Sequence, residues 1–167
     1  VALLGGVEPE KIKEALGAFE GAERRLDIHV NGARAAYIDD YAHHPEELAS
    51  AIGSIRNMFP GRRICGIFQP HLYTRTRDFA PQFAESLSML DELLLLDIYP
   101  ARELPIEGVD SSLIFKKVTI EKKRQISKED VLNVLGDMDI DILVTFGAGD
   151  IDRLIPAITE LVKERNR

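Results

Sequence analysis

The sequence predicts an α/β fold with a Rossmann-like, mostly parallel sheet and helices on both faces of the sheet. Strand-like segments alternate along the chain with segments whose apolar residues follow helical spacing. The strand-like segments at 93–96 and 142–144 are apolar at every position, as a strand covered on both faces requires. Polar segments follow four of the predicted strands. Because ligands in such sheets bind outside the carboxyl ends of the strands, these segments predict one shared site.

The elements follow one another in a regular order. A first helix is predicted over residues 8–19, with Pro9 in its first turn and apolar residues at helical spacing. Strands are then predicted at 34–38, 63–68, 92–97 and 141–146. Further helices are predicted at 45–58, around 79–90, at 111–118, at 128–135, and from the last strand to about residue 165. Such alternation indicates parallel strands joined by right-handed crossovers.

The first 25 residues are predicted to belong to a separate unit. The helix at 8–19 begins in mid-pattern, and the glycine and charged residues at 21–25 resemble an interdomain linker. We therefore expect residues 1–25 to be the end of a preceding domain with its linker. Residues 26–167 are expected to form the main domain, and 167 residues are enough to bury one good core.

Composition narrows the class of protein. With 21 Lys plus Arg against 28 Asp plus Glu, the formal net charge is −7, which argues against general binding to nucleic acid or to anionic lipid. No apolar run is long enough for a membrane span, and no signal peptide is indicated. We therefore expect a soluble, cytoplasmic protein. Cys65 is the only cysteine and is predicted to lie buried in a strand.

Residues 39–45 read Asp-Asp-Tyr-Ala-His-His-Pro and are the densest polar cluster. They fit a metal site, an acid/base pair, or a pocket in which a carboxylate binds ribose hydroxyls and a ring covers a base. The metal site is disfavoured because neighbouring residues of an extended segment point to opposite sides. A structural alternative is that Asp40 or His44 caps the helix that begins at Pro45. Contact with a nucleotide or substrate is the favoured interpretation.

Residues 68–78 read Phe-Gln-Pro-His-Leu-Tyr-Thr-Arg-Thr-Arg-Asp and concentrate cationic groups in a predicted loop ahead of a helix. The planar fork of an arginine donates two parallel hydrogen bonds to a carboxylate or phosphate, and helix N-termini also attract anions. Arg75 is therefore a candidate anion-binding residue. For Arg77, an ion pair with Asp78 on a solvated face is an equal alternative.

Two further polar segments carry less weight. The turn at 146–151, Phe-Gly-Ala-Gly-Asp-Ile, lets backbone approach a ligand closely, but a tight strand-to-helix turn needs the same glycines. It is a weak dinucleotide fingerprint because the third glycine is missing. In the segment 97–103, Arg102 and Glu103 are interpreted as exposed residues at the rim of the site.

Four motifs taken in order resemble the C-terminal domain of the Mur ligases of bacterial peptidoglycan synthesis. These motifs are residues 39–45, residues 68–78, Leu-Asp-Ile-Tyr-Pro-Ala-Arg-Glu at 96–103 and Gly-Ala-Gly-Asp-Ile at 147–151. In addition, Phe-Glu-Gly-Ala-Glu-Arg-Arg at 19–25 looks like the end of the family's central ATPase domain. The Thr-Arg-Thr-Arg-Asp run at 74–78 points to the branch of the family that adds alanine.

The resemblance implies a reaction. ATP would phosphorylate the carboxylate of UDP-N-acetylmuramate, and the amine of L-alanine would attack the acyl phosphate through a tetrahedral intermediate. ATP would be the cofactor, with Mg²⁺ held mainly by the central domain. The N-terminal and central domains of the same enzyme would be the partners of this domain, and no nucleic-acid or membrane partner is implied.

Site residues carry over from the family motifs by position. The resemblance implies that Asp40 contacts the ATP ribose, that His43 lies near the adenine, and that Pro45 also belongs to the ATP-binding residues. The substrate side would be formed by Tyr41, His71, Arg75, Gly147, Ala148, Gly149 and Asp150. Among these, His71 and Arg75 would be catalytic, because they would stabilise the acyl phosphate and the oxyanion. Many relatives carry Arg where this chain has Leu72, so more of the anion binding would fall to His71 and Arg75.

The sequence contains no G-x-x-G-K-[ST] phosphate loop. We therefore expect the chain alone not to catalyse ligation, and we expect a rigid-body closure of this domain hinged near residues 24–26. Three alternatives remain open. They are a sister ligase that attaches a preformed peptide, a non-catalytic nucleotide-binding module, and a metal-dependent phosphoesterase built on the Asp/His cluster.

Overall fold

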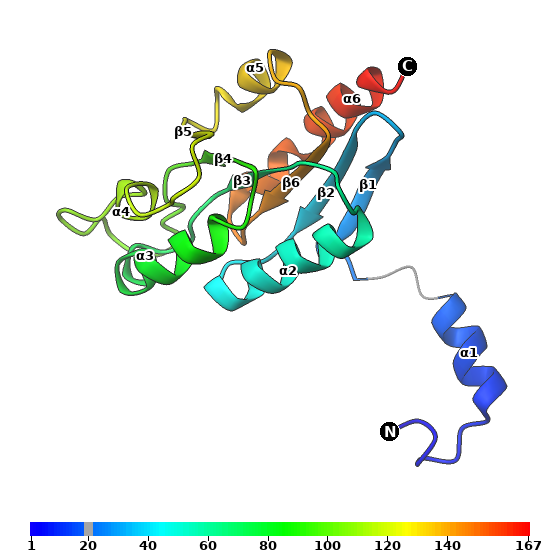
Figure 1. Cartoon of the computed structure of the whole chain (residues 1–167). Helices are drawn as coiled ribbons and strands as arrows, with labels where there is room; N and C mark the ends of the chain where they lie inside the picture. Colours follow the sequence, from blue (N-terminus) through cyan, green and yellow to red (C-terminus); the bar gives the residue numbers. More distant parts are fainter. Residues whose placement is uncertain (19–21) are drawn as a thin grey trace.

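A computed structural model describes residues 1–18 and 22–167, and its centre is a six-stranded sheet (Figure 1). The strands are β1 (Asp27–Asn31), β2 (Ala36–Asp40), β3 (Ile64–Phe68), β4 (Glu92–Leu95), β5 (Lys123–Gln125) and β6 (Ile142–Phe146). Their spatial order is β1-β2-β6-β3-β4-β5. Only the β1–β2 pair is antiparallel; the other four pairs are parallel. The predicted mostly parallel sheet is confirmed.

Helices cover both faces of this sheet, as Figure 1 shows. On one face lie α2 (Pro45–Met58), α3 (Tyr73–Leu87) and α4 (Ser112–Phe115); on the other lie α5 (Val131–Gly136) and α6 (Ile155–Arg165), which follows the 3₁₀ helix η1 (Asp150–Leu154). Successive side chains of β6 enter the two cores alternately, with Val144 in the core under α2 and Leu143 in the core under α6. This double burial explains the uninterrupted apolar runs of the central strands.

The topology brings three loops together at the carboxyl ends of neighbouring parallel strands. β6 lies between β2 and β3, and all three strands run parallel. The chain passes from β2 and β3 into α2 and α3 on one face, but from β6 into η1 and α6 on the other. The connections therefore diverge at the carboxyl ends of these strands, which is where sheets of this kind bind ligands.

The start of α3 differs from the prediction. The helix begins at Tyr73, whereas the sequence suggested a loop until about residue 79. The backbone at Phe79 is non-helical (φ −119°, ψ 15°) just before Pro81, so the predicted start of the helix coincides with a kink inside α3. The N–H of Thr76 already donates to the carbonyl of Leu72 at 3.1 Å, which places Arg75 in the first turn of a helix.

Other boundaries also shifted. β2 covers Ala36–Asp40 instead of 34–38, so the two adjacent aspartates end the strand itself. The edge strands β1 and β5 were not predicted, because β5 is the three polar residues Lys-Arg-Gln and β1 is buried at one position only. The helices predicted at 111–118 and 128–135 shrink to α4 and α5.

The N-terminal helix α1 (Pro9–Gly17) has no buried residue, and Figure 1 shows it apart from the sheet. Its predicted last residue, Phe19, and the first predicted linker residue, Gly21, lie outside the described residues. None of the helices in the described part combines the length and hydrophobicity that crossing a bilayer requires. Cys65 is buried in β3 as predicted, and burial raises the pKa of its thiol to about 12.

Candidate functional site

Four of the predicted site residues come together at the carboxyl edge of the sheet. The ring centroids of Tyr41 and His43 lie 5.2 Å apart, and those of His43 and His71 lie 6.1 Å apart. Nη1 of Arg75 lies 3.3 Å from Nδ1 of His71. The segments after β2 and β3 therefore form a continuous row of one phenol, two imidazoles and one guanidinium.

Tyr99, in the segment after β4, completes this row and was not recognised as a site residue from the sequence. Its ring stacks on His71 with centroids 5.7 Å apart and planes 26° apart. Its N–H donates to the carbonyl of Pro70, and its carbonyl accepts from the N–H of Leu72. These bonds hold the segment after β4 against the loop that carries His71. The available signal was an aromatic residue just past the carboxyl end of a predicted strand.

The residue just before α3 has an unusual backbone conformation. Leu72 has φ +74°, which a residue with a β-carbon adopts only at some cost. The Thr74 N–H donates to a carboxylate oxygen of Glu103 at 3.0 Å. Glu103 keeps part of its side chain exposed but anchors the start of α3 through Thr74, so it has a structural role beyond that of an exposed rim residue. His71 lies just before the helix and Arg75 in its first turn, and the two side chains meet there with Nη1 of Arg75 3.3 Å from Nδ1 of His71.

Arg77 does not join the row. Its Nε donates to Asp78 at 2.7 Å, and both side chains are about half exposed. The alternative predicted for Arg77, an ion pair with Asp78 on a solvated face, is therefore confirmed. Within the described part of the chain, Arg75 is the arginine of the 68–78 segment that faces the imidazoles.

Arg75 gives the row a fixed positive charge. Burial lowers the pKa of the His71 imidazole, and the nearby charges of Arg75 and His43 lower it further. Burial, followed by the same arginine and by His43, lowers the pKa of His44 in the same way. Both rings are thus neutral near pH 7, where a neutral imidazole can donate one hydrogen bond and accept another.

A pH-dependent loss of stability is expected from His71. Its folded-state pKa lies below the ordinary histidine value of about 6.5, so the unfolded chain binds more protons in that range. The free energy of unfolding should therefore fall as the pH drops from about 7.5 to 5.5. Chemical denaturation at both pH values should show a smaller loss for His71→Asn than for the unchanged chain. Equal losses would contradict the assignment.

Asp40 lies beside the row but faces the other way. The side chain is buried, its Oδ1 accepts the N–H of Ala42 at 2.8 Å and its Oδ2 accepts the N–H of Leu26 at 2.8 Å. Burial raises the pKa of the carboxyl. Asp40 lines a cavity of about 420 Å³ together with Arg25 and Glu47 on the α2 side. Its place in a ribose site remains a prediction.

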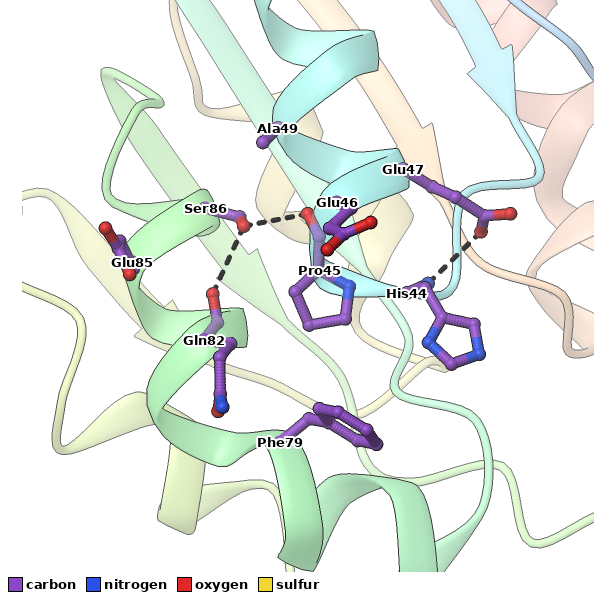
Figure 2. Close-up of a pocket in the computed structure, with 9 residues that line it drawn as sticks. All are labelled: His44, Pro45, Glu46, Glu47, Ala49, Phe79, Gln82, Glu85 and Ser86. Atoms are coloured by element: carbon purple, nitrogen blue, oxygen red, sulfur yellow. Dashed lines mark hydrogen bonds between the residues drawn. The ribbon is translucent and has the colours of Figure 1, made fainter.

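A larger cavity of about 610 Å³ lies between the start of α2 and α3. Figure 2 shows the residues that line it, namely His44, Pro45, Glu46, Glu47, Ala49, Phe79, Gln82, Glu85 and Ser86. The rings of His44 and Phe79 meet edge to face with centroids 5.9 Å apart. This cavity shares Glu46 and Glu47 with the 420 Å³ cavity beside Asp40, so the two adjoin at the first turn of α2.

His44 is the N-cap residue of α2 and forms a capping box with Glu47 in the first turn of the helix. Glu47 reaches back from the first turn, and its Oε2 accepts the N–H groups of His43 and His44 at 3.0 and 3.2 Å. The Nδ1 of His43 lies 3.0 Å from the carbonyl oxygen of Tyr41. The capping alternative is therefore confirmed for His44 but not for Asp40, whose oxygens accept the N–H groups of Leu26 and Ala42, and the His44 ring also lines the large cavity.

The glycine turn after β6 packs tightly against Gln69. Gly147 has φ +141°, and a β-carbon there would lie 2.9 Å from the carbonyl oxygen of Gln69. The Gln69 side chain donates to Asp150 at 2.9 Å and accepts the N–H of Ile151 at 3.0 Å. Asp150 also forms an ion pair with Lys128. The turn therefore needs its glycines for its own shape, and its contact with an amino acid remains a prediction.

Candidate metal ligands do not cluster. Within residues 1–18 and 22–167, no three His, Cys, Asp or Glu side chains come together in a way that would hold a metal ion. Asp39 and Asp40 point to opposite sides of β2, as adjacent residues of a strand do. Each carboxylate oxygen of both residues already accepts one hydrogen bond from the protein itself.

Comparison with known proteins places the chain in a family. The profile of the family described as "Mur ligase, glutamate ligase domain" matches residues 24–149. The UDP-N-acetylmuramate–L-alanine ligase of Parabacteroides distasonis is 51% identical over 167 residues, which is 100% of this chain and 36% of that protein. The enzyme of the same name from Cytophaga hutchinsonii is 45% identical over 164 residues, 98% of this chain and 35% of that protein. The chain thus spans about a third of the length of these curated relatives.

Solved structures agree on the fold. The UDP-N-acetylmuramate-alanine ligase of Thermotoga maritima is similar with a TM-score of 0.79 and 23% identity, over 98% of this chain and 35% of that one. A murein peptide ligase from Psychrobacter arcticus is similar with a TM-score of 0.65 and 20% identity, over 87% of this chain and 32% of that one. With the family match over residues 24–149 and 51% identity to a curated relative, these comparisons show that the chain belongs to the Mur ligase family.

Proposed function

We propose that this chain is the carboxyl-terminal domain of an ATP-dependent ligase that joins L-alanine to the muramate carboxyl group of UDP-N-acetylmuramate in the cytoplasm. Relatives named for that reaction match the whole chain. In this proposal, residues 1–25 are the end of the preceding ATPase domain with its linker, and residues 26–167 are the domain itself. The N-terminal and central domains of the same enzyme are its partners.

The observation that carries the proposal is the His71–Arg75 pair in the row of Tyr41 and His43. The reaction forms an acyl phosphate and then a tetrahedral oxyanion, both of which carry negative charge. A guanidinium donates two parallel hydrogen bonds to such oxygens, and a neutral imidazole donates one. Fixed donors aimed at developing charge are among the strongest catalytic devices in enzymes. Arg75 and His71 are therefore assigned as the catalytic residues of this domain.

The two adjoining cavities suit ATP. The carboxylate of Asp40 accepts two N–H groups, but a carboxylate has about four lone-pair sites and can still accept a ribose hydroxyl. Beyond Glu46 and Glu47, the larger cavity offers the flat faces of His44 and Phe79 next to Pro45, which suits a base. Mg²⁺ and the ATP phosphates are assigned to the central domain.

Ligation by the full-length protein is the direct test. ADP release should require both UDP-N-acetylmuramate and L-alanine, and the 167-residue chain alone should release none. Adding the N-terminal part as a separate protein should restore part of the activity, because the phosphate loop absent from this sequence would then be supplied. Product formed by the chain alone would overturn the proposal.

Two controls separate the alternative functions. A sister ligase would accept a tripeptide in place of L-alanine, so both amines are compared with the full-length protein. A metal-dependent phosphoesterase would bind Mn²⁺ tightly through this domain, and calorimetry of the 167-residue chain with Mn²⁺ measures that binding. Preference for the tripeptide, or tight Mn²⁺ binding with phosphoester hydrolysis, would replace the proposed function.

A further inference from the structure

The guanidinium of Arg24 joins parts of the domain that are far apart in the sequence. Its Nε donates to Asp39 at the end of β2 at 2.9 Å, and its Nη2 donates to the carbonyl of Gly147 after β6 at 2.7 Å. Nη1 lies 3.7 Å from Asp152 in η1. The Cζ atom lies 5.1 Å from the centroid of the Tyr41 ring. One side chain thus contacts two of the loops that form the candidate site.

The main anchor of Arg24 lies inside the domain. The side chain of Asp39 is fully buried, and its other oxygen accepts the hydroxyl of Thr145 at 2.6 Å. The Thr145 hydroxyl lies 3.0 Å from that of Tyr37, whose pKa is raised by burial. A buried carboxylate needs a cation and hydrogen bonds, and Arg24 supplies the cation here. The arginine is therefore fixed on a rigid part of the sheet.

The backbone around Arg24 is hydrogen-bonded to the residues at the carboxyl end of β2. Its carbonyl accepts the N–H of Tyr41 at 2.7 Å, and the N–H of Leu26 donates to Asp40. Arg24 and Leu26 have φ +57° and +45°, a left-handed conformation that persists in such residues only where the surroundings impose it. A hinge placed within residues 24–26 would have to break these bonds.

We propose that Arg24 is a positioning residue that couples the segment before β1 to the substrate side of the site. Removing its guanidinium releases the Gly147 carbonyl and the Tyr41 ring together, because both depend on the same side chain. In the intact domain, the shape of the glycine turn therefore depends on the position of residues 24–26. These residues connect the domain to the part of the chain that precedes it. The catalytic meaning of this coupling rests on the proposed function, but the coupling itself does not.

Hydrogen exchange of the 167-residue chain tests the coupling without any need for catalysis. In Arg24→Ala, the backbone amides of Tyr41, Gly147 and Ile151 should exchange at least about tenfold faster, while amides within β3 keep their rates. Arg24→Lys should keep the Asp39 ion pair, and with it the Tyr41 amide, but should still release the turn at Gly147. A single ammonium does not reproduce the fork that reaches both acceptors.

Arg63→Ala is the matched control. Arg63 also forms an arginine–aspartate ion pair, with Asp139, but at the amino ends of the strands, so its loss should leave the three amides unchanged. Unchanged exchange at Gly147 in both Arg24 variants, or equal acceleration across the sheet in Arg24→Lys, would overturn the proposal. In the full-length protein, Arg24→Lys should raise the KM for L-alanine more than the KM for ATP. An inactive unchanged enzyme would refute the proposed function and leave the exchange result standing.

Discussion

Replacing Arg75 by alanine in the full-length protein is expected to lower kcat/KM for ligation by about 10²- to 10³-fold, the usual cost of losing one fixed donor to a developing oxyanion. Arg75 is the guanidinium within 3.3 Å of His71, and the pKa of that imidazole is lowered, so no positive charge on the histidine compensates. The dissociation constant of ATP should change little, because the two cavities beside Asp40 and Pro45 are not lined by Arg75. Steady-state kinetics and calorimetry with a non-hydrolysable ATP analogue measure the two effects separately.

Arg77→Ala is the control for that experiment. Arg77 lies two residues further along α3 and pairs with Asp78 on the surface, so ligation should change less than about threefold, as expected for an exposed ion pair. Arg75→Lys should recover part of the activity, since it keeps the charge but loses the fork. If Arg75→Ala left turnover intact and weakened nucleotide binding, the nucleotide-binding module would become the better interpretation.

The sequence was sufficient for the architecture because the central strands are apolar on both faces. β3, β4 and β6 are covered by helices on each side, and their composition shows it directly. The edge strands escaped prediction for the opposite reason. A strand with one neighbour and a solvated face, such as β5, needs no apolar residues, so its pairing with β4 is a consequence of tertiary structure.

The candidate site was predictable in part. The residue types after β2 and β3 pointed to one anion site, and Tyr41, His43, His71 and Arg75 do lie together. The direction of each side chain was not predictable, because a shift of strand register by a residue or two decides which face it joins. Asp40 therefore turned out to face α2.

The roles of Tyr99 and Arg24 depend on contacts between distant segments. Tyr99 stacks on a histidine 28 positions earlier in the chain, and Arg24 reaches a carbonyl 123 positions later. Neither contact leaves a local pattern in the sequence. Both residues lie outside the strands and helices, where the backbone path is set by tertiary bonds and not by periodicity.

Gly149→Ala should be among the most damaging small substitutions in the domain. The backbone at Gly149 (φ −86°, ψ −159°) is open to any residue, so the effect is purely steric. A β-carbon there would lie 2.5 Å from Oε1 of Gln69, 2.7 Å from Cγ of Tyr99 and 2.8 Å from its Cβ. Gln69 cannot move freely because it bonds Asp150 and Ile151, and Tyr99 is tied by its backbone to the loop of His71. Overpacking of this kind costs about 1–3 kcal/mol of unfolding free energy.

Gly53→Ala provides the comparison, because it is the same chemical change with the opposite expected sign. Gly53 lies inside α2, nothing comes within 4 Å of a β-carbon there, and alanine favours a helix over glycine by about 1 kcal/mol. Thermal or chemical denaturation of the two variants should therefore diverge by about 2–4 kcal/mol. In the full-length protein, Gly149→Ala should also impair ligation, because displacing Tyr99 removes the ring stacked on His71. A Gly149→Ala variant as stable as Gly53→Ala would mean that Tyr99 yields easily, and then Tyr99 could not be what orients the histidine.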